Sequence, residues 1–160
     1  MRIRDARLSD ASTLIDFNAR MAWETEEKKL DPVVLGRGVQ RLLADATLGR
    51  YFVAVADGDN NDKDDDDDDD SEVLGQLMVT SEWSDWRDGH FWWIQSVYVR
   101  EDARRQGIYR ALHKHVLDEA RRAGNVVGVR LYVEPHNERA QATYAQLGMK
   151  KTYEVMEQSL

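Results

Sequence analysis

The sequence predicts a mixed α/β domain with a central, mostly antiparallel sheet that contains one parallel pair of strands. Segments with helical and strand-like spacing of apolar residues follow each other in the order β-α-α-β-β-β-α-β-α-β. The third helical segment, residues 108–123, joins two β-branched strands, and such a crossover places its strands in parallel. Because 160 residues can bury one sizeable core, we expect residues 1–160 to form a single domain.

The first half of the chain opens with one strand and two helices. Apolar and polar residues alternate in "MRIRDAR", as they do in a strand. Ser9 or Asp10 can cap the helix that follows, because a short polar side chain accepts hydrogen bonds from the first backbone N–H groups of a helix. Asp31 before Pro32 is a strong start signal for a second helix, which we expect to end near Gly49.

A strongly acidic segment separates the next two predicted strands, residues 50–57 and 73–83. Residues 57–72 hold ten aspartates, one glutamate and one lysine. Two strands joined by a polar segment predict a hairpin with an enlarged loop. Because the carboxylates repel each other and have nothing to bury, we expect the insertion at 58–71 to be disordered.

A calcium-binding loop is the alternative interpretation of this segment. Asp57, Asp59 and Asn61 match the first three ligand positions of such a loop. Asp62 and Asp68, however, stand where the loop requires a glycine and a glutamate, and the expected flanking elements are strands rather than helices. The sequence therefore favours a solvated insertion.

The second half of the chain alternates strands and helices. Runs of β-branched and aromatic residues predict strands. Two segments with apolar residues at helical spacing predict helices, and each segment ends at a glycine. The expected elements are a strand at 90–99, the helix at 108–123, a strand at 126–134, a helix at 137–148 and a closing strand at 149–158.

Charge and composition exclude several classes of function. Outside residues 57–72 the chain carries 21 basic and 19 acidic residues, so the body of the domain is nearly neutral and offers no dominant basic stripe for nucleic acid. The absence of cysteine excludes disulfides, thiolate metal sites and a cysteine nucleophile. His113 and His115 face different sides of one helix, and we expect no metal site. With no long apolar run, we expect no membrane partner and a cytoplasmic location.

The stretch "ARRQGIYRAL", residues 103–112, predicts an anion site at the start of a helix. The first N–H groups of a helix lack internal partners and carry partial positive charge. Gly107 allows a tight turn and a close approach of the backbone, and Arg104 and Arg105 add full charges. A pyrophosphate fits such a place. The alternative is an ordinary solvated turn.

Two motifs together resemble the Gcn5-related N-acetyltransferase (GNAT) superfamily. They are "VYVREDARRQGIYRAL" and, some thirty residues later, "LYVEPHNERAQATYAQLGM". The resemblance covers the whole order of elements and implies a sheet that is split at its parallel pair. The family's pyrophosphate loop and its later motif fall on Arg104, Gly107, Asn137, Ala140, Tyr144 and Gly148. Tyr109 departs from the pattern, because the family usually has glycine or alanine there; its N–H can still serve a phosphate, and we expect its ring to point away from the diphosphate.

The resemblance implies acetyl-coenzyme A as co-substrate, bound in a V-shaped opening between the strands 90–99 and 127–134. Backbone amides at the start of the helix would hold the pyrophosphate, strand 90–99 would pair with the pantetheine arm, and Asn137 would touch the amide end of that arm. The residues expected to bind the co-substrate are Val97, Tyr98, Val99, Arg104, Arg105, Gln106, Gly107, Ile108, Tyr109, Arg110, Asn137, Ala140 and Tyr144.

The same resemblance implies direct transfer to an amine. A backbone N–H near Val97 would stabilise the developing oxyanion. Tyr144 would protonate the departing thiolate as general acid, a role that suits a side chain that is neutral at pH 7. The alternative for Tyr144 is a core aromatic without a chemical role.

The general base and the acceptor site are less defined. Many relatives use a glutamate on the strand equivalent to 90–99, where this chain has Gln95 and Ser96. Carboxylates beside tryptophans would suit a cationic amine, although each is also an ordinary surface charge. The candidates are Glu82, Asp85 and His90 for the base, and Glu24, Glu26, Trp83 and Gln95 for the acceptor, with Glu24 and Glu26 as further base candidates.

The leading functional hypothesis is an acetyl-CoA-dependent N-acetyltransferase that acts on a primary amine of a small, cationic or peptide acceptor. The alternative is a non-catalytic acyl-CoA-binding or sensor domain, which would keep "RRQGIYRA" and lack the chemistry. A third hypothesis is that the acidic loop docks a basic partner. Because relatives are often dimers, the resemblance also implies a homodimer.

Deleting residues 58–71 should leave acetyl transfer intact, because a solvated insertion contributes nothing to the core or to the motifs. The measurement is thiol release from acetyl-CoA in the presence of an amine panel. A large loss of activity in a variant that still folds would contradict a passive loop.

Overall fold

The computed structural model describes residues 1–57 and 71–158. Both interpretations of the acidic segment, disorder at 58–71 and a calcium loop, therefore concern residues outside the described ones. The exceptions are the end residues Asp57 and Ser71.

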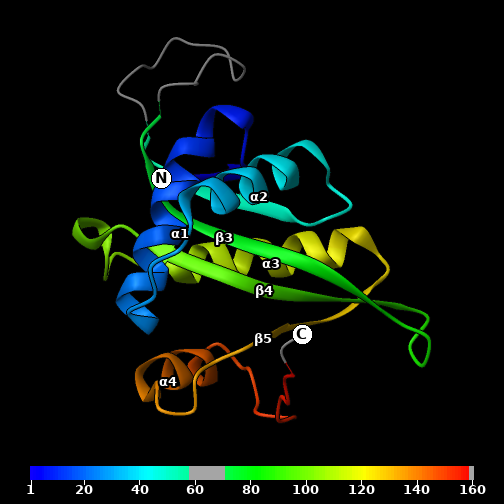
Figure 1. The fold of residues 1–160 in the computed structure, drawn as a ribbon. Helices are drawn as coiled ribbons and strands as arrows, with labels where there is room; N and C mark the ends of the chain where they lie inside the picture. Colours follow the sequence, from blue (N-terminus) through cyan, green and yellow to red (C-terminus); the bar gives the residue numbers. More distant parts are fainter. Residues whose placement is uncertain (58–70, 159–160) are drawn as a thin grey trace.

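One five-stranded sheet forms the centre of the molecule, with its strands in sequence order (Figure 1). Its first four strands pair antiparallel with their neighbours, and β4 pairs parallel with β5. This confirms the parallel pair that the crossover at 108–123 predicts. The strands are β1 (Arg2–Asp5), β2 (Arg50–Val55), β3 (Val73–Ser84), β4 (Gly89–Val99) and β5 (Val126–Leu131).

Helices cover both faces of the sheet. Helices α1 (Ala11–Glu26) and α2 (Pro32–Ala44) lie on one face, and α3 (Ile108–Ala123) lies on the other (Figure 1). Strand β2 shows why both faces are apolar: Phe52 packs with the α3 core and Val53 with the core under α1 and α2, since successive side chains of a strand point to opposite faces.

Of the two aspartates predicted to cap helices, one forms the cap and the other does not. Asp31 caps α2 as predicted, because its Oδ1 accepts hydrogen bonds from the N–H groups of Val33 and Val34, at 2.8 and 3.1 Å. Asp10 occupies the N-cap position of α1 but gives that helix no side-chain cap. Its carboxylate is buried and accepts hydrogen bonds from Arg4, at 2.7 and 3.0 Å, and from the N–H of Arg7, at 2.7 Å.

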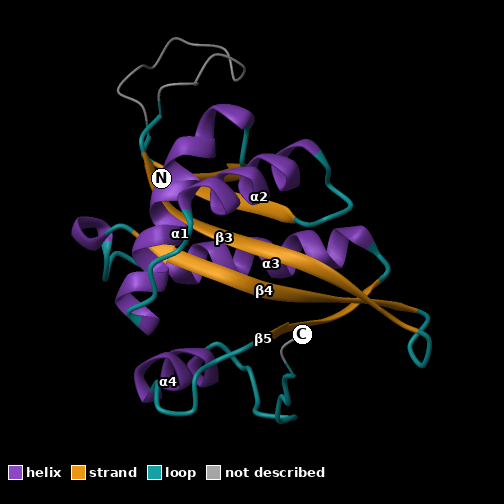
Figure 2. Ribbon diagram, viewed as in Figure 1, coloured by secondary structure: helices purple, strands orange, loops and turns teal. Residues whose placement is uncertain are grey.

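The closing strand predicted at 149–158 is wrong. Figure 2 draws this segment as loop, and its residues are mostly exposed. The N–H of Met149 bonds the carbonyl of Tyr144, but no described residue after it makes a backbone hydrogen bond to a strand. An alternating pattern specifies which side chains share a face, but a strand also needs a partner backbone. Within the described residues, β4 is the only neighbour of β5.

The ion pair of Arg4 and Asp10 should make stability depend on pH. Burial alone would raise the pKa of Asp10, but hydrogen bonds and charges from Arg4 and Arg7 lower it below its usual range. A lowered pKa means that the stabilisation is present above the unfolded value of about 3.9 and is lost as the pH falls through the folded value. Asp10→Asn should therefore lower the free energy of unfolding by about 1–3 kcal/mol at pH 7 and by less below pH 3.

Urea denaturation at the two pH values measures this difference. Asp16→Asn is the matched control, because Asp16 pairs with Arg20 on the exposed surface of α1 and should contribute little. An equal loss for Asp10→Asn at both pH values would contradict the assignment.

Candidate active site

Strand β4 pairs with β5 only along the first half of its length. The parallel pairing runs from His90 to Ile94, whose partner is Leu131, and β5 ends there. On its other edge β4 stays paired with β3 as far as Val99. The backbone of β4 after Ile94 therefore presents an open edge on the side of β5, and such an edge can pair with another extended chain.

A β-bulge marks the point of separation. Met78 pairs with Ser96 and Val79 with Ile94, which leaves Gln95 as the extra residue of β4. Bulges bend a strand and re-aim its side chains, and they are frequent beside active sites. The side chain of Gln95 is exposed and donates a hydrogen bond to Thr80 Oγ1 at 2.8 Å.

The loop after β4 ends in the predicted anion site. Gly107 is the N-cap of α3 and has a φ of +81°, the left-handed region that favours glycine. A Cβ at this position would meet no atom within 4 Å, so the space beside the helix start is open. Arg105 also has a positive φ, of 65°, and its side chain is exposed. The free N–H groups of the first helical turn thus face an accessible space.

Arg104 fixes the beginning of this loop. Its Nε donates to the carbonyl of Val99 at 2.9 Å, and its guanidinium pairs with Glu24 of α1 at 2.6 Å. The other carboxylate oxygen of Glu24 accepts a hydrogen bond from the hydroxyl of Tyr98 at 3.0 Å. Burial and the neighbouring Glu24 raise the pKa of Tyr98. The three side chains join α1, the end of β4 and the loop.

A cavity of about 320 Å³ lies between β4, the start of α3 and α4 (Glu138–Gln146). It brings together residues of the two sequence motifs, which lie about 30 to 50 positions apart along the chain. Its lining consists of Val97, Tyr109, Asn137, Arg139, Ala140, Thr143 and Tyr144. Asn137 also caps α4, because its Oδ1 accepts a hydrogen bond from the N–H of Ala140 at 3.0 Å. Sequence reasoning missed Arg139 and Thr143, which carry no motif signal of their own.

Two phenol rings meet in this cavity. The ring centres of Tyr109 and Tyr144 lie 5.9 Å apart in an edge-to-face arrangement, which stabilises a pair by about 0.5–1.5 kcal/mol beyond the buried area. Burial raises the pKa of Tyr144. The pKa of Tyr109 is raised mainly by burial and, to a smaller extent, by the nearby Tyr144. Both phenols therefore stay protonated at neutral pH, and Tyr144 is able to donate a proton.

Glu82, a predicted base, lies away from this cavity. It pairs with Phe91 in the sheet, six residues before Val97 on β4, a span of about 20 Å along a strand. Its carboxylate accepts hydrogen bonds from Trp93 Nε1 at 2.7 Å and from Arg130 at 3.2 Å. The structure does not bring Glu82 together with Tyr144.

Asp85 and Trp83 lie still farther away, at the β3–β4 hairpin. Asp85 accepts a hydrogen bond from the backbone N–H of Trp86 at 2.9 Å within the turn. Trp83 packs edge-to-face against His90, with ring centres 5.0 Å apart. Of the predicted acids, Glu24 is the one that the structure brings to the end of β4, and Glu26 is exposed at the end of α1.

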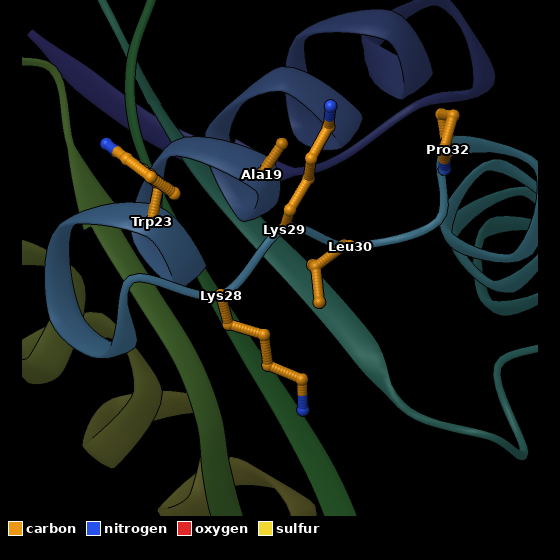
Figure 3. Close-up of a pocket in the computed structure, with 6 residues that line it drawn as sticks. All are labelled: Ala19, Trp23, Lys28, Lys29, Leu30 and Pro32. Atoms are coloured by element: carbon orange, nitrogen blue, oxygen red, sulfur yellow. The ribbon is translucent and has the colours of Figure 1, made fainter.

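A second cavity, of about 460 Å³, lies between α1 and α2 (Figure 3). Its lining is Ala19, Trp23, Lys28, Lys29, Leu30 and Pro32. The ammonium groups of Lys28 and Lys29 point to opposite sides of the connecting segment in Figure 3. Sequence reasoning missed this cavity, and the lysine pair after the acidic "ETEE" is the signal that could have indicated a basic edge here.

Metal and membrane signals are absent from the part of the chain that the structure describes. No group of three or more histidine, aspartate or glutamate side chains in residues 1–57 and 71–158 is arranged to hold a metal ion. Within the same ranges, no helix has the length and apolar character that a bilayer crossing requires.

Comparison with known proteins decides the family. The family model described as "Acetyltransferase (GNAT) family" matches residues 21–149, which include β4, the loop, α3 and α4. The chain belongs to the GNAT family of acetyltransferases. The GNAT fold explains the mixed sheet and its single parallel pair, and the resemblance of the two motifs is confirmed.

Solved structures agree with a GNAT assignment. A possible acetyltransferase from Clostridium difficile 630 is 41% identical, with a TM-score of 0.87 over 99% of this chain and 97% of that chain. A probable acetyltransferase is 24% identical, with a TM-score of 0.79 over 100% and 97%. The ribosomal-protein-alanine N-acetyltransferase from Brucella melitensis biovar Abortus 2308 is 17% identical, with a TM-score of 0.72 over 99% and 98%. The latter two show the fold alone. No curated protein sequence matches this chain.

Acetyl-CoA is the general co-substrate of GNAT enzymes. Two accessible backbone segments of this site fit its pantetheine arm and its diphosphate. The unpaired edge of β4 after Ile94 is extended backbone that suits the pantetheine arm. The start of α3 at Gly107 is open and suits the diphosphate.

Replacing Gly107 tests the anion site. Gly107→Ala should weaken coenzyme A binding about fivefold to thirtyfold, because an ordinary L-residue pays about 1–2 kcal/mol in the left-handed region while its Cβ meets no neighbour. Gly107→Asn is the matched control and should lose less, since asparagine tolerates this region. Isothermal titration with coenzyme A measures both, and equal affinity for the glycine and alanine proteins would contradict the role of this backbone conformation.

Proposed function

We propose that this protein transfers the acetyl group of acetyl-CoA directly to the primary amine of a small-molecule or peptide acceptor. The observation that carries the proposal is the cavity in which Tyr144 of α4 faces the open edge of β4 at Val97. Membership of the GNAT family supports acetyl transfer in general. The acyl-CoA-binding sensor is not favoured, because the cavity keeps the phenol that the chemistry needs.

The co-substrate would lie along elements that the core holds in place. The backbone of Val97 to Val99 pairs with the pantetheine arm, and the N–H groups from Gln106 to Arg110 hold the diphosphate. Arg105 is exposed beside them and adds positive charge. Arg104 holds the start of the loop in place, because it donates hydrogen bonds to the carbonyl of Val99 and to the carboxylate of Glu24.

The chemistry is one nucleophilic substitution at the thioester. The neutral amine attacks the carbonyl carbon, and a backbone N–H near Val97 stabilises the oxyanion as the C–N bond forms. The C–S bond then breaks, and the thiolate takes the phenolic proton of Tyr144. The nitrogen loses its extra proton, and Tyr144 regains one from solvent, so charge and atoms balance. Burial raises the pKa of Tyr144, which keeps the acid protonated at working pH.

No carboxylate among the predicted acids stands ready as a base in the cavity. Glu82 and Asp85 lie toward the hairpin end of β4, and Glu24 already accepts hydrogen bonds from Tyr98 and Arg104. We propose that the acceptor amine enters in its neutral form or loses its proton through water.

The preference for a cationic amine stays a prediction of the sequence, and the structure places positive charges beside two of the predicted acids. Arg130 faces Glu82, Arg104 faces Glu24, and Lys28 and Lys29 line the cavity between α1 and α2. These positive charges offset the field that would attract a cationic amine. The acceptor is therefore proposed as a primary amine without a requirement for further positive charge. A homodimer and a cytoplasmic location stay predictions of the sequence.

Removing the phenol of Tyr144 tests the mechanism. Tyr144→Phe should lower kcat about a hundredfold or more and leave coenzyme A affinity within about twofold, because a general acid acts in the chemical step. Tyr153→Phe is the matched control, since Tyr153 is exposed in the segment after α4. Thiol release from acetyl-CoA across a panel of neutral and cationic amines measures kcat, and a loss of less than about tenfold would contradict the acid role.

A further inference from the structure

Tyr109 is a departure from the family pattern that the proposed function does not use. It is the second residue of α3, its side chain is half-buried, and its ring packs beside the core under that helix. Its ring lies in the wall of the cavity with Tyr144, 5.9 Å from ring centre to ring centre. The side chain therefore points toward α4.

Helix α4 has no fully buried residue, and Tyr144 is one of its half-buried side chains. Its side-chain hydrogen bonds run back to the preceding loop, where Gln141 donates to the carbonyls of Glu134 and Pro135 at 3.0 and 2.8 Å. In residues 71–158, no hydrogen bond or ion pair joins α4 to the sheet or to α3. Figure 1 shows α4 below β5, apart from the helices that cover the sheet. The ring contact of Tyr144 with Tyr109 joins α4 directly to the first turn of α3.

We propose that Tyr109 is a positioning residue that docks α4 onto the first turn of α3 and thereby holds the phenol of Tyr144 beside Val97. The inference rests on the proposed acid role of Tyr144. A glycine or alanine, which the family usually has here, offers no side chain for this contact. The edge-to-face pair is directional, so it sets the orientation of the Tyr144 ring as well as its distance.

The ring rather than the hydroxyl of Tyr109 makes this contact. Its hydroxyl is buried and has no hydrogen-bond partner among the described residues. Tyr109→Phe should therefore preserve docking, whereas Tyr109→Leu removes the aromatic contact and keeps most of the apolar volume. A residue that acts on coenzyme A binding would change affinity, and a residue that positions the acid changes kcat instead.

Hydrogen exchange tests the docking without using activity. In Tyr109→Leu, the amides of α4 should exchange about threefold to tenfold faster than in the wild-type protein, and those of α3 after its first turn should be unchanged. In Tyr109→Phe both helices should exchange within about twofold of wild type. Unchanged exchange in α4 of the leucine variant would overturn the inference, whatever the role of Tyr144.

Turnover with the best amine of the panel tests the consequence. Tyr109→Leu should lower kcat about threefold to tenfold, Tyr109→Phe should stay within about twofold, and coenzyme A affinity should be unchanged in both. In a Tyr144→Phe background, Tyr109→Leu should cause no further loss, because both substitutions act through one phenol. Lys114→Ala, on the exposed side of α3, controls for a general effect on that helix.

The possible failures are distinguishable. Wild-type turnover in Tyr144→Phe means that the acid role fails, and faster exchange of α4 in Tyr109→Leu then still supports docking. Full turnover in Tyr109→Leu combined with a large loss in Tyr144→Phe overturns the positioning role. An equal loss of turnover in Tyr109→Leu with and without the Tyr144 phenol overturns it as well.

Discussion

The place where β4 stops pairing with β5 determines the rest of the site. β3 holds one edge of β4 as far as Val99, while the other edge loses its partner after Ile94. A row of unpaired N–H and C=O groups is ordinarily a liability, because it attracts other chains. Here the bulge at Gln95 and the departure of β5 turn that row toward a cavity. The strand is thus fixed by the sheet and still able to pair with an extended ligand.

The two halves of the site are held with very different strength. α3 packs on the sheet through fully buried side chains such as Leu112 and Val116, so the proposed anion site at Gly107 begins a helix that the core holds in place. No residue of α4 is fully buried, and Tyr144 is half-buried. Regions with few buried contacts open most easily. The proposed co-substrate side is therefore held by the core, whereas the proposed acid Tyr144 stands on a helix with few buried contacts, among them its ring contact with Tyr109.

Two of the predicted acids, Glu24 and Glu82, are paired with arginines. Arg104 and Glu24 join the loop to α1, and Arg130 binds Glu82 while its guanidinium lies 3.4 Å from the ring centre of Phe91. A charge that already has a close partner exerts little net field on an incoming substrate. We therefore expect these two acids to contribute little to the recognition of a charged acceptor.

The sequence by itself determined the type of most elements, and it predicted the two motifs whose residues the structure brings to one cavity. Those signals are local: apolar periodicity, Asp31 before Pro32, and a glycine and arginines at a helix start act over a few residues. Only the tertiary structure decided that residues 149–158 form no strand, that Asp85 lies at the far hairpin, and that Tyr109 meets Tyr144. Each of these depends on which distant segments lie side by side, and a residue pattern along the chain specifies a face without specifying what that face will contact.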